Sequence, residues 1–515
     1  MLLLRRLIIL SHRYLGIVIS LAVVIWFASG IVMMYAGGMP RLDPHTRIEK
    51  LPALDFSRIT LSPAAAAARV GLEGSAPLLT SVMERPAYRF QGARAPTLFA
   101  DTGELLAPID AATAREIASR FVAAALEHVH LDRTLNEPDQ WTLSNRERAT
   151  LHKFVVDDGD GTEIYVSAET ADVRLVTTRS QRLLAWIGTI PHWIYFAGLK
   201  TNQPLWYQIV VWTAALACCL SVLGLILAVT QFRVTRPFQW SKAVVYRGWM
   251  RWHYISGAIF GVFALTWAFS GLMSMEPWDW TRARGLEVRR DVFSGGAPEI
   301  PVTLIDGAAL QQAVGDRSIK ELGFTRVHGE QFYTIRATAK SLPDGSRPER
   351  LHEPYSDGGR RGTRGGLLVA AETLAMRSEP YSQDAIVTRL RSSLPAGVNI
   401  VEQLMLDDYD DYYYSRGRQA PLPVLRFKFD DPMQTWIYVD PRGSDIVAQT
   451  HRYSRIERWL YNGLHSLDFK FWYSKRPLWD IGMIVLLLGG LVSSVLGLYL
   501  GLKRLVRNLA PARRP

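Results

Sequence analysis

Four stretches of the sequence are long and apolar enough to cross a lipid bilayer, and they constrain the fold more than any other feature. Each has about the 20 residues that a helix needs to span the hydrocarbon core. No Asp, Glu, Lys or Arg interrupts them, apart from Asp480 near the start of the last. We therefore predict an α-helical membrane protein with spans at residues 14–35, 205–229, 254–275 and 479–502.

The positive charge of the chain is concentrated in three segments that flank these runs. The N-terminal residues, the linker 232–252 and the tail 503–515 together hold thirteen Lys and Arg and no acidic residue. The positive-inside rule places these segments in the cytoplasm, so segments 37–204 and 276–478 are expected outside. Without the thirteen, 46 basic residues balance the 48 acidic ones, so the net charge of +11 does not indicate nucleic-acid binding.

The first apolar run is predicted to be a retained helix, because it exceeds the 7–15 residues of a signal peptide and no A-x-A site follows it. The only cysteines, Cys218 and Cys219, lie inside the second run, where small packing residues are expected. No C-x-x-C-H motif is present, which excludes a covalently attached c-type haem.

The chain repeats itself, and the repeats cover the spans and their entrances. Residues 12–34 match residues 253–275 at a spacing of 241, and residues 182–206 match 455–479 at a spacing of 273. Ser-Val-Leu-Gly-Leu then begins at Ser221 and again at Ser494. This pattern predicts an internal duplication, each half being a helix, an outer domain and a second helix. The matched positions include His12/His253, Trp26/Trp267, Ser29/Ser270, Arg182/Arg455, His192/His465 and Trp206/Trp479.

The outer segments show mixed α and β patterning. Residues 111–129 have the apolar spacing of a helix. Residues 147–177 are predicted to form strands joined at Asp-Gly-Asp-Gly, and residues 423–450 repeat this hairpin. The predicted order is cytoplasmic N-terminus and first helix 1–36, outer domain 37–204, second helix 205–231, basic linker 232–252, third helix 253–275, outer domain 276–478, fourth helix 479–502 and basic tail 503–515.

Four of the eleven histidines recur in pairs at the ends of the spans. His12 and His253 stand at the predicted cytoplasmic side, and His192 and His465 stand at the outer side. An interfacial structural role is one interpretation. The other is ligation, because facing helices build cofactor sites in bundle cores and six-coordinate haem iron takes two axial ligands. One centre near each face would divide the membrane into shorter electron-transfer steps. Trp26 and Trp267, between the two levels, are either packing residues or part of the electron path.

The most unusual outer stretch is Asp-Asp-Tyr-Asp-Asp-Tyr-Tyr-Tyr-Ser-Arg-Gly, residues 407–417. It is interpreted either as a solvated, tyrosine-rich strand and turn or as a docking surface for a cationic or metal-bearing ligand.

The paired motifs "HRYLG…W…SG" and "RWLYNGLHSLDF…RPLWD", with "DDYYYSRG" and "WIYVDPRGSDI", resemble the PepSY-associated transmembrane proteins, iron-regulated membrane proteins of bacteria. The resemblance covers nearly the whole chain. It implies four membrane helices with two α+β PepSY-like periplasmic domains, in the bacterial inner membrane with both termini cytoplasmic. It also implies one or two non-covalent b-type haems. The implied iron ligands are His12, His192, His253 and His465.

The resemblance implies a transmembrane reductase that delivers electrons to a periplasmic ferric siderophore and releases Fe(II). Arg13, Arg182 and Arg455 are candidate partners of haem propionates, because Arg suits carboxylates. No G-x-G-x-x-G follows a strand, so the electron donor is expected to be external, either a quinol or a cytoplasmic reductase. The alternatives are a non-redox membrane protein that binds peptides or regulates a protease, and a haem or metal transporter.

Overall fold

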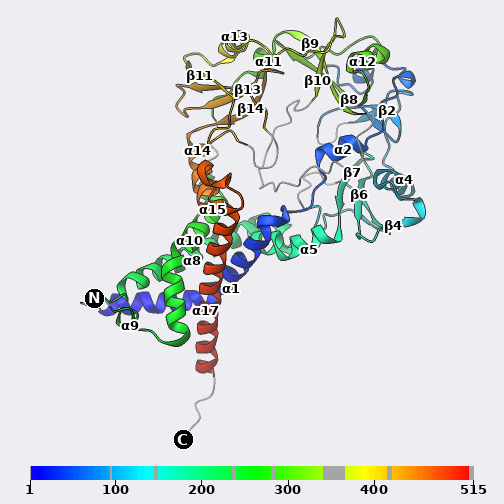
Figure 1. The fold of residues 1–515 in the computed structure, drawn as a ribbon. Coiled ribbons are helices and arrows are strands. Elements are labelled where there is room, and N and C mark those ends of the chain that lie inside the picture. Colours follow the sequence, from blue (N-terminus) through cyan, green and yellow to red (C-terminus); the bar gives the residue numbers. More distant parts are fainter. Residues whose placement is uncertain are drawn as a thin grey trace. The chain divides into compact units, whose positions relative to one another are not determined.

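The computed structural model describes residues 2–92, 96–143, 149–234, 236, 239–279, 285–339, 366–414 and 420–509. The chain folds into two compact units (Figure 1). Within the described residues, the helical unit comprises the chain up to residue 39, residues 183–283 and the chain from residue 452. The sheet unit comprises residues 40–182 and 284–451.

Four long helices dominate the helical unit: α1 (Leu2–Ala36), α8 (Gln203–Thr230), α10 (Gly248–Met273) and α17 (Leu478–Leu509). Each is long and apolar enough to cross a membrane. Both α1 and α10 pack against α8 and α17. At the ends that carry the basic residues, α1, α10 and α17 extend beyond the predicted apolar runs. Residues such as Arg and Leu are good helix formers, so the helix continues beyond its apolar part.

Short helices lead into α8 and α17 in the same order. Before α8 lie α5 (Arg179–Ile187), α6 (Thr189–Trp193) and α7 (Ala197–Lys200). Before α17 lie α14 (Arg452–Arg458), the π-helical turn η4 (Trp459–Gly463), α15 (Leu464–Ser466) and α16 (Lys470–Tyr473). The sequence predicted that both short-helix segments belong to the outer domains. In the structure they belong to the helical unit, except for residues 179–182 at the start of α5. The linker holds α9 (Trp240–Ala243), and η3 (Pro277–Asp279) follows α10.

Both short-helix segments are fixed by equivalent contacts. Ile194 and Leu467 adopt left-handed backbone angles that end α6 and α15. The indole of Trp206 donates to the carbonyl of Ile194 at 3.1 Å, and that of Trp479 donates to the carbonyl of Leu467 at 3.4 Å. These bonds satisfy carbonyls that the interrupted helices leave without an intrahelical partner.

One six-stranded antiparallel sheet contains strands from both outer segments. Its order is β10 (Leu367–Ala370), β9 (Glu330–Ala339), β8 (Arg317–Val327), β1 (Leu78–Val82), β2 (Arg85–Arg89) and β3 (Thr97–Phe99). The junction is the pairing of Leu79 with Leu322 and of Thr80 with Glu321. The two segments expected as separate domains are therefore continuous. Their shared core includes residues of α3 (Pro63–Arg69) and α12 (Gly307–Val314).

Each outer segment also forms a four-stranded antiparallel sheet with a helix against it. The first contains β4 (Val129–Leu135), β5 (Leu151–Val156), β6 (Glu163–Ser167) and β7 (Val173–Thr177), with α4 (Ala111–Val122). The second contains β11 (Ile400–Leu406), β12 (Val424–Phe429), β13 (Trp436–Asp440) and β14 (Asp445–Thr450), with α13 (Gln383–Ser393). The predicted hairpins are confirmed. The predicted helix 111–129 ends at Val122, because Ala123 turns left-handed.

The remaining short elements of the sheet unit are α2 (Pro44–Lys50), η1 (Phe56–Arg58), η2 (Leu126–His128) and α11 (Arg290–Ser294). A buried carboxylate ties α2 to the six-stranded sheet. Glu321 of β8, 1% exposed, forms ion pairs with Arg47 of α2 at 2.6 Å and with Arg336 of β9 at 2.5 Å. A buried charge persists in a protein only when it is paired in this way.

Replacing Glu321 by Gln should loosen this junction, because two guanidinium groups lose their counter-charge. We expect a loss of about 1–3 kcal/mol in local stability. Hydrogen-exchange mass spectrometry on the full-length protein in detergent should show faster exchange in β8 and β9. Glu299→Gln is the matched control, since Glu299 pairs with Arg326 but has a 72% exposed side chain. Equal exchange in both variants would contradict a structural role for Glu321.

Candidate functional site

His12 and His253 face each other inside the helix bundle. Their ring centroids are 6.3 Å apart, and the ring planes are inclined by 31°. His12 belongs to α1 and His253 to α10. We call them the inner pair. The sequence predicted that both histidines stand at the start of a helix, and this prediction is wrong. His12 lies ten residues after the start of α1, and His253 lies five residues after the start of α10. The charge at a helix N-terminus therefore bears little on the inner pair.

Each inner imidazole is bonded to the backbone of a neighbouring helix. Nδ1 of His12 lies 3.1 Å from the carbonyl oxygen of Leu220 in α8. Nδ1 of His253 lies 3.0 Å from the carbonyl oxygen of Ser493 in α17. A carbonyl oxygen can only accept, so Nδ1 carries the proton in both rings and Nε2 keeps its lone pair.

A glycine opens the way to each of these carbonyls. Gly224 and Gly497 lie four residues after Leu220 and Ser493, one helical turn further along. A Cβ at Gly224 would lie 3.0 Å from Cε1 of His12, and one at Gly497 would lie 3.1 Å from Cε1 of His253. Any side chain at these positions would press against the imidazole. Both glycines belong to the repeated Ser-Val-Leu-Gly-Leu motif, a signal that the sequence contained and that we did not interpret.

His192 and His465 form a second pair, the outer pair, on the short helices. Their ring centroids are 6.1 Å apart, and the ring planes are nearly perpendicular at 81°. His192 lies on α6, which packs against α1, and His465 lies on α15, which packs against α10. The structure thus brings together the two histidines of each pair that the repeats match.

Repeated serines hold the outer imidazoles. Oγ of Ser29 lies 3.0 Å from Nδ1 of His192, and Oγ of Ser270 lies 2.9 Å from Nδ1 of His465. Each serine hydroxyl donates its own proton to a carbonyl of its helix, at Ile25 for Ser29 and at Trp267 for Ser270. Each Oγ therefore accepts from Nδ1–H of the histidine. All four imidazoles are then protonated on Nδ1 and present Nε2 as a potential ligand, as in most metal-ligating histidines.

The two pairs lie at different levels along α1 and α10. Ser29 is 17 residues beyond His12, and Ser270 is 17 residues beyond His253, so each serine marks the level of the outer pair. At 1.5 Å per residue the levels are about 26 Å apart along the helices, comparable to the thickness of a bilayer core. Phe27, Trp267 and Phe263 lie between, with ring centroids 5.6 Å apart for Phe27–Trp267 and 6.2 Å for Phe263–Trp267.

The surroundings of the outer pair differ between the two halves. The ring of Tyr461 stacks on His465, with centroids 5.2 Å apart and an angle of 29°. The matching position in the first half is Gly188, which has no side chain to stack. Arg455 and Arg458 of α14 are each 9% exposed, and Arg458 lies 3.9 Å from the buried carboxylate of Asp468. The second half thus adds an aromatic ring against His465.

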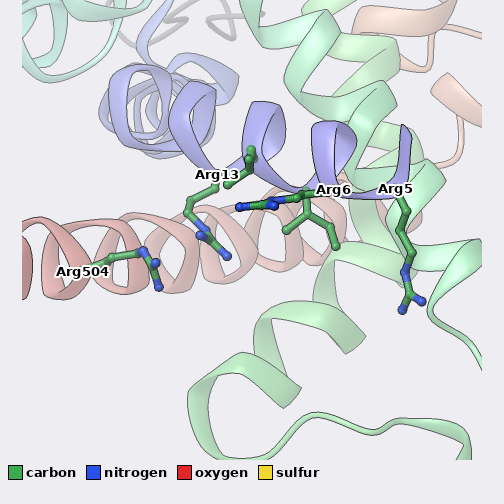
Figure 2. A pocket seen from close by; sticks show the side chains of 6 residues that line it. Arg5, Arg6, Arg13 and Arg504 are labelled. Carbon is green, nitrogen blue, oxygen red and sulfur yellow. The ribbon is translucent and has the colours of Figure 1, made fainter. Parts of the chain in front are cut away.

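The other two predicted arginines are engaged elsewhere. The guanidinium of Arg182 donates to the carbonyl of Gly161 at 2.8 Å and to Thr177, and it lies 3.5 Å from Glu163. These partners belong to the sheet unit, so Arg182 is committed there. Arg13 lines an open hollow between α1 and α17 together with three other arginines (Figure 2).

Asp410 is the centre of a hydrogen-bond network in the acidic, tyrosine-rich stretch. Asp410 accepts hydrogen bonds from Arg426 at 2.8 Å and from the hydroxyl of Tyr438 at 2.9 Å, and it caps the backbone of Tyr412 and Tyr413. This network favours the interpretation as an ordered turn. Residues 415–417 of the predicted stretch lie outside the described residues.

Within the described residues no group of three or more His, Cys, Asp or Glu side chains is arranged around a metal-sized space. The histidine pairs instead offer two imidazoles each. Two ligands do not complete the shell of a bare transition-metal ion, but they do complete that of haem iron, whose porphyrin supplies the other four nitrogens. With ring nitrogens roughly 1 Å from each ring centre and metal–nitrogen bonds of about 2 Å, two axial imidazoles have centroids about 6 Å apart. Both pairs have this separation.

Comparison with known proteins agrees with this architecture. A search of the curated proteins found no match. A family model described as the PepSY-associated TM region matches residues 9–504, which include all four long helices nearly in full and both histidine pairs. The match confirms the resemblance seen in the sequence and supports a membrane protein. The chain therefore belongs to the PepSY-associated TM region family.

Proposed function

We propose that this protein is a haem b oxidoreductase of the bacterial inner membrane that passes electrons across the bilayer to a ferric chelate. The observation that carries the proposal is the arrangement of the two histidine pairs. Each pair has centroids about as far apart as two imidazoles that ligate one haem iron would be, and each imidazole is bonded through Nδ1, which leaves Nε2 unprotonated.

In this proposal His12 and His253 hold one haem and His192 and His465 hold another, both non-covalently. Haem supplies a one-electron couple when it is bound. The protein's own residues orient the ligands, through Leu220 and Ser493 at the inner pair and through Ser29 and Ser270 at the outer pair. Of the arginines proposed for propionates, Arg455 is the one that is buried and belongs, on α14, to the helical unit that carries the histidines.

The hydrogen bonds also favour one direction of electron flow. A backbone carbonyl is a stronger acceptor than a serine hydroxyl, so Nδ1–H···O=C makes the inner imidazoles the more electron-donating ligands. More basic ligands stabilise the oxidised iron and lower its potential. With haem bound, the inner pair would therefore give the lower potential and the outer pair the higher one, which would favour electron flow from inner to outer.

The proposed topology follows the basic segments. The N-terminus, the linker and the tail lie in the cytoplasm, and the sheet unit lies in the periplasm. Equivalent elements, equivalent hydrogen bonds and the 241- and 273-residue spacings support an origin by internal duplication. The proposed substrate is a periplasmic ferric siderophore. One electron converts its Fe(III) to Fe(II), which hard oxygen ligands hold less tightly. A quinol or a cytoplasmic reductase supplies the electrons.

The ligand assignment predicts which histidines carry absorbance. His12→Ala or His253→Ala should remove the inner haem and spare the outer one, and His192→Ala or His465→Ala should do the reverse. Dithionite-reduced spectra of haem-loaded, purified protein should show about half of the α-band in each variant. Ferric electron paramagnetic resonance should assign the lost centre, since near-perpendicular ligand planes give a larger highest g value than near-parallel ones.

His128→Ala is the matched control for these variants, because His128 is an exposed residue of the sheet unit. Full absorbance in all four paired-histidine variants would reject the ligand assignment. A wild-type protein that stays colourless after haem supplementation would overturn the redox function and favour a non-redox role.

The glycine contacts predict a selective loss of the inner centre. Gly224→Leu should displace His12, since even the first side-chain carbon would lie 3.0 Å from the ring. Leu also has a higher helix propensity than Gly, so α8 itself should not be weakened. We expect about half of the haem absorbance to remain. Gly271→Leu in α10 is the control, because no atom lies within 4 Å of the position of its Cβ. Equal haem content in the two variants would show that Gly224 has no role.

The reductase activity predicts a defined stoichiometry. Anaerobic mixing of reduced, haem-loaded protein with a ferric hydroxamate should bleach the α-band and yield one Fe(II) per electron lost, measured with ferrozine. The gallium(III) form of the same chelate should leave the α-band unchanged, because Ga(III) is not reduced. A reduced protein that is stable towards ferric chelates while retaining both haems would contradict the proposed substrate but not the haem ligation.

A further inference from the structure

An open hollow of about 410 Å³ between α1 and α17 is lined by four arginines and two apolar residues. Arg5, Arg6 and Arg13 come from α1 and Arg504 comes from α17. Figure 2 shows the guanidinium groups of Arg13 and Arg504 pointing to the same side of the two helices, although the residues are far apart in the sequence. Arg13 is half-buried, and the other three are exposed.

The positive charge of the hollow is not balanced within the described part of the chain. None of its four arginines forms an ion pair with a carboxylate there, and Arg5 bonds the neutral amide of Gln231 at 2.8 Å. The N-terminal segment, the linker and the tail contain no acidic residue at all. Four guanidinium groups gathered in one hollow repel one another, so an anion that enters it is attracted strongly.

Membrane topology alone does not explain this concentration of charge. The positive-inside rule needs basic residues on the cytoplasmic side but not in one groove. The equivalent positions of the other half, around the start of α10 and the end of α8, hold two arginines, Arg247 and Arg251, and two tyrosines whose rings pack together with centroids 5.4 Å apart. The counterparts of Arg5, Arg6, Arg13 and Arg504 are Tyr246, Arg247, Tyr254 and Gln231.

The length of the helices places the hollow at the depth of lipid headgroups. α1 has 35 residues and α17 has 32, whereas about 20 residues cross the hydrocarbon core. The surplus residues are the basic ones at the N-terminal end of α1 and the C-terminal end of α17. Phosphate groups of phospholipids occupy this layer.

Apolar side chains surround the arginines. Ile9 and Leu10 line the hollow itself. Leu7 of α1 is 61% exposed, and Val506 of α17 is 65% exposed. A water-soluble phosphate compound would not use such a border, whereas the acyl chains of a lipid would lie against it.

We propose that this hollow binds the phosphate of an anionic phospholipid through Arg6, Arg13 and Arg504, with the acyl chains along α1 and α17. Guanidinium groups suit phosphate because they form paired, charge-assisted hydrogen bonds with it. The bound lipid bridges the first and last helices of the chain. It therefore holds α1, which carries His12, against α17, which carries the carbonyl that orients His253.

Native mass spectrometry of delipidated, full-length protein tests the proposal. We expect phosphatidylglycerol or cardiolipin to bind at least tenfold more tightly than phosphatidylethanolamine of the same acyl chains. Arg13→Gln/Arg504→Gln should weaken binding of the anionic lipids about 10- to 30-fold, from the loss of two surface charges. Arg247→Gln is the matched control, since Arg247 is the counterpart of Arg6 in the other groove, and it should bind like the wild type.

Three outcomes would overturn the proposal: equal binding of anionic and zwitterionic lipids, an unchanged affinity in the double variant, or complete displacement of the lipid by inorganic phosphate alone. The last would identify a soluble phosphate site. Haem absorbance is recorded in parallel, so a failure of the lipid proposal is distinguishable from a failure of the redox function.

Discussion

Two hydrogen bonds from imidazoles to helix backbones join α1 to α8 and α10 to α17 within the helical unit. The carbonyls of Leu220 and Ser493 belong to helical turns, where each already receives the N–H of the residue four positions on. Their second lone pair is open to His12 and His253 because Gly224 and Gly497 have no side chains. In an apolar bundle an unsatisfied polar group costs several kcal/mol, so these bonds fix the helices that carry the imidazoles.

The hydrogen bonds at Nδ1 determine what the other ring nitrogen can do. Nδ1 bonds the backbone at the inner pair and a serine at the outer pair, so Nε2 carries no proton and has the lone pair that a metal ligand needs. Two imidazoles at the observed separation would suit an iron whose other four ligands come from a porphyrin. The facing pairs are therefore a reason to propose a cofactor, beyond the resemblance of the motifs.

The repeats made much of the site predictable, because two copies of one pattern within a chain reveal positions that the pattern requires. They matched His12 with His253 and His192 with His465, and they also contained Ser29, Ser270, Gly224 and Gly497. The roles of these serines and glycines were not predictable, since they depend on which carbonyl or ring lies opposite after the helices have packed. The joined sheet was likewise hidden: β1 and β8 meet through two residue pairs, between strands more than 230 residues apart. The basic helix ends were missed because hydropathy stops at the first arginines, whereas the helical backbone does not.

The two halves of the chain supply equivalent histidines, whereas the inner and outer levels hold them differently, and this difference between the levels would give the proposed electron path a direction. Two identical centres would give an electron no preference for either side. Here the inner rings bond carbonyls and are inclined by 31°, while the outer rings bond hydroxyls, stand at 81° and receive Tyr461 in one half alone. Of the four arginines of the hollow, two have tyrosine, one has glutamine and one has arginine as its counterpart in the other half. The repeated histidines would set the number of proposed haem sites, and the difference between the two levels would set their order in potential. Electron transfer across a membrane in one direction needs both.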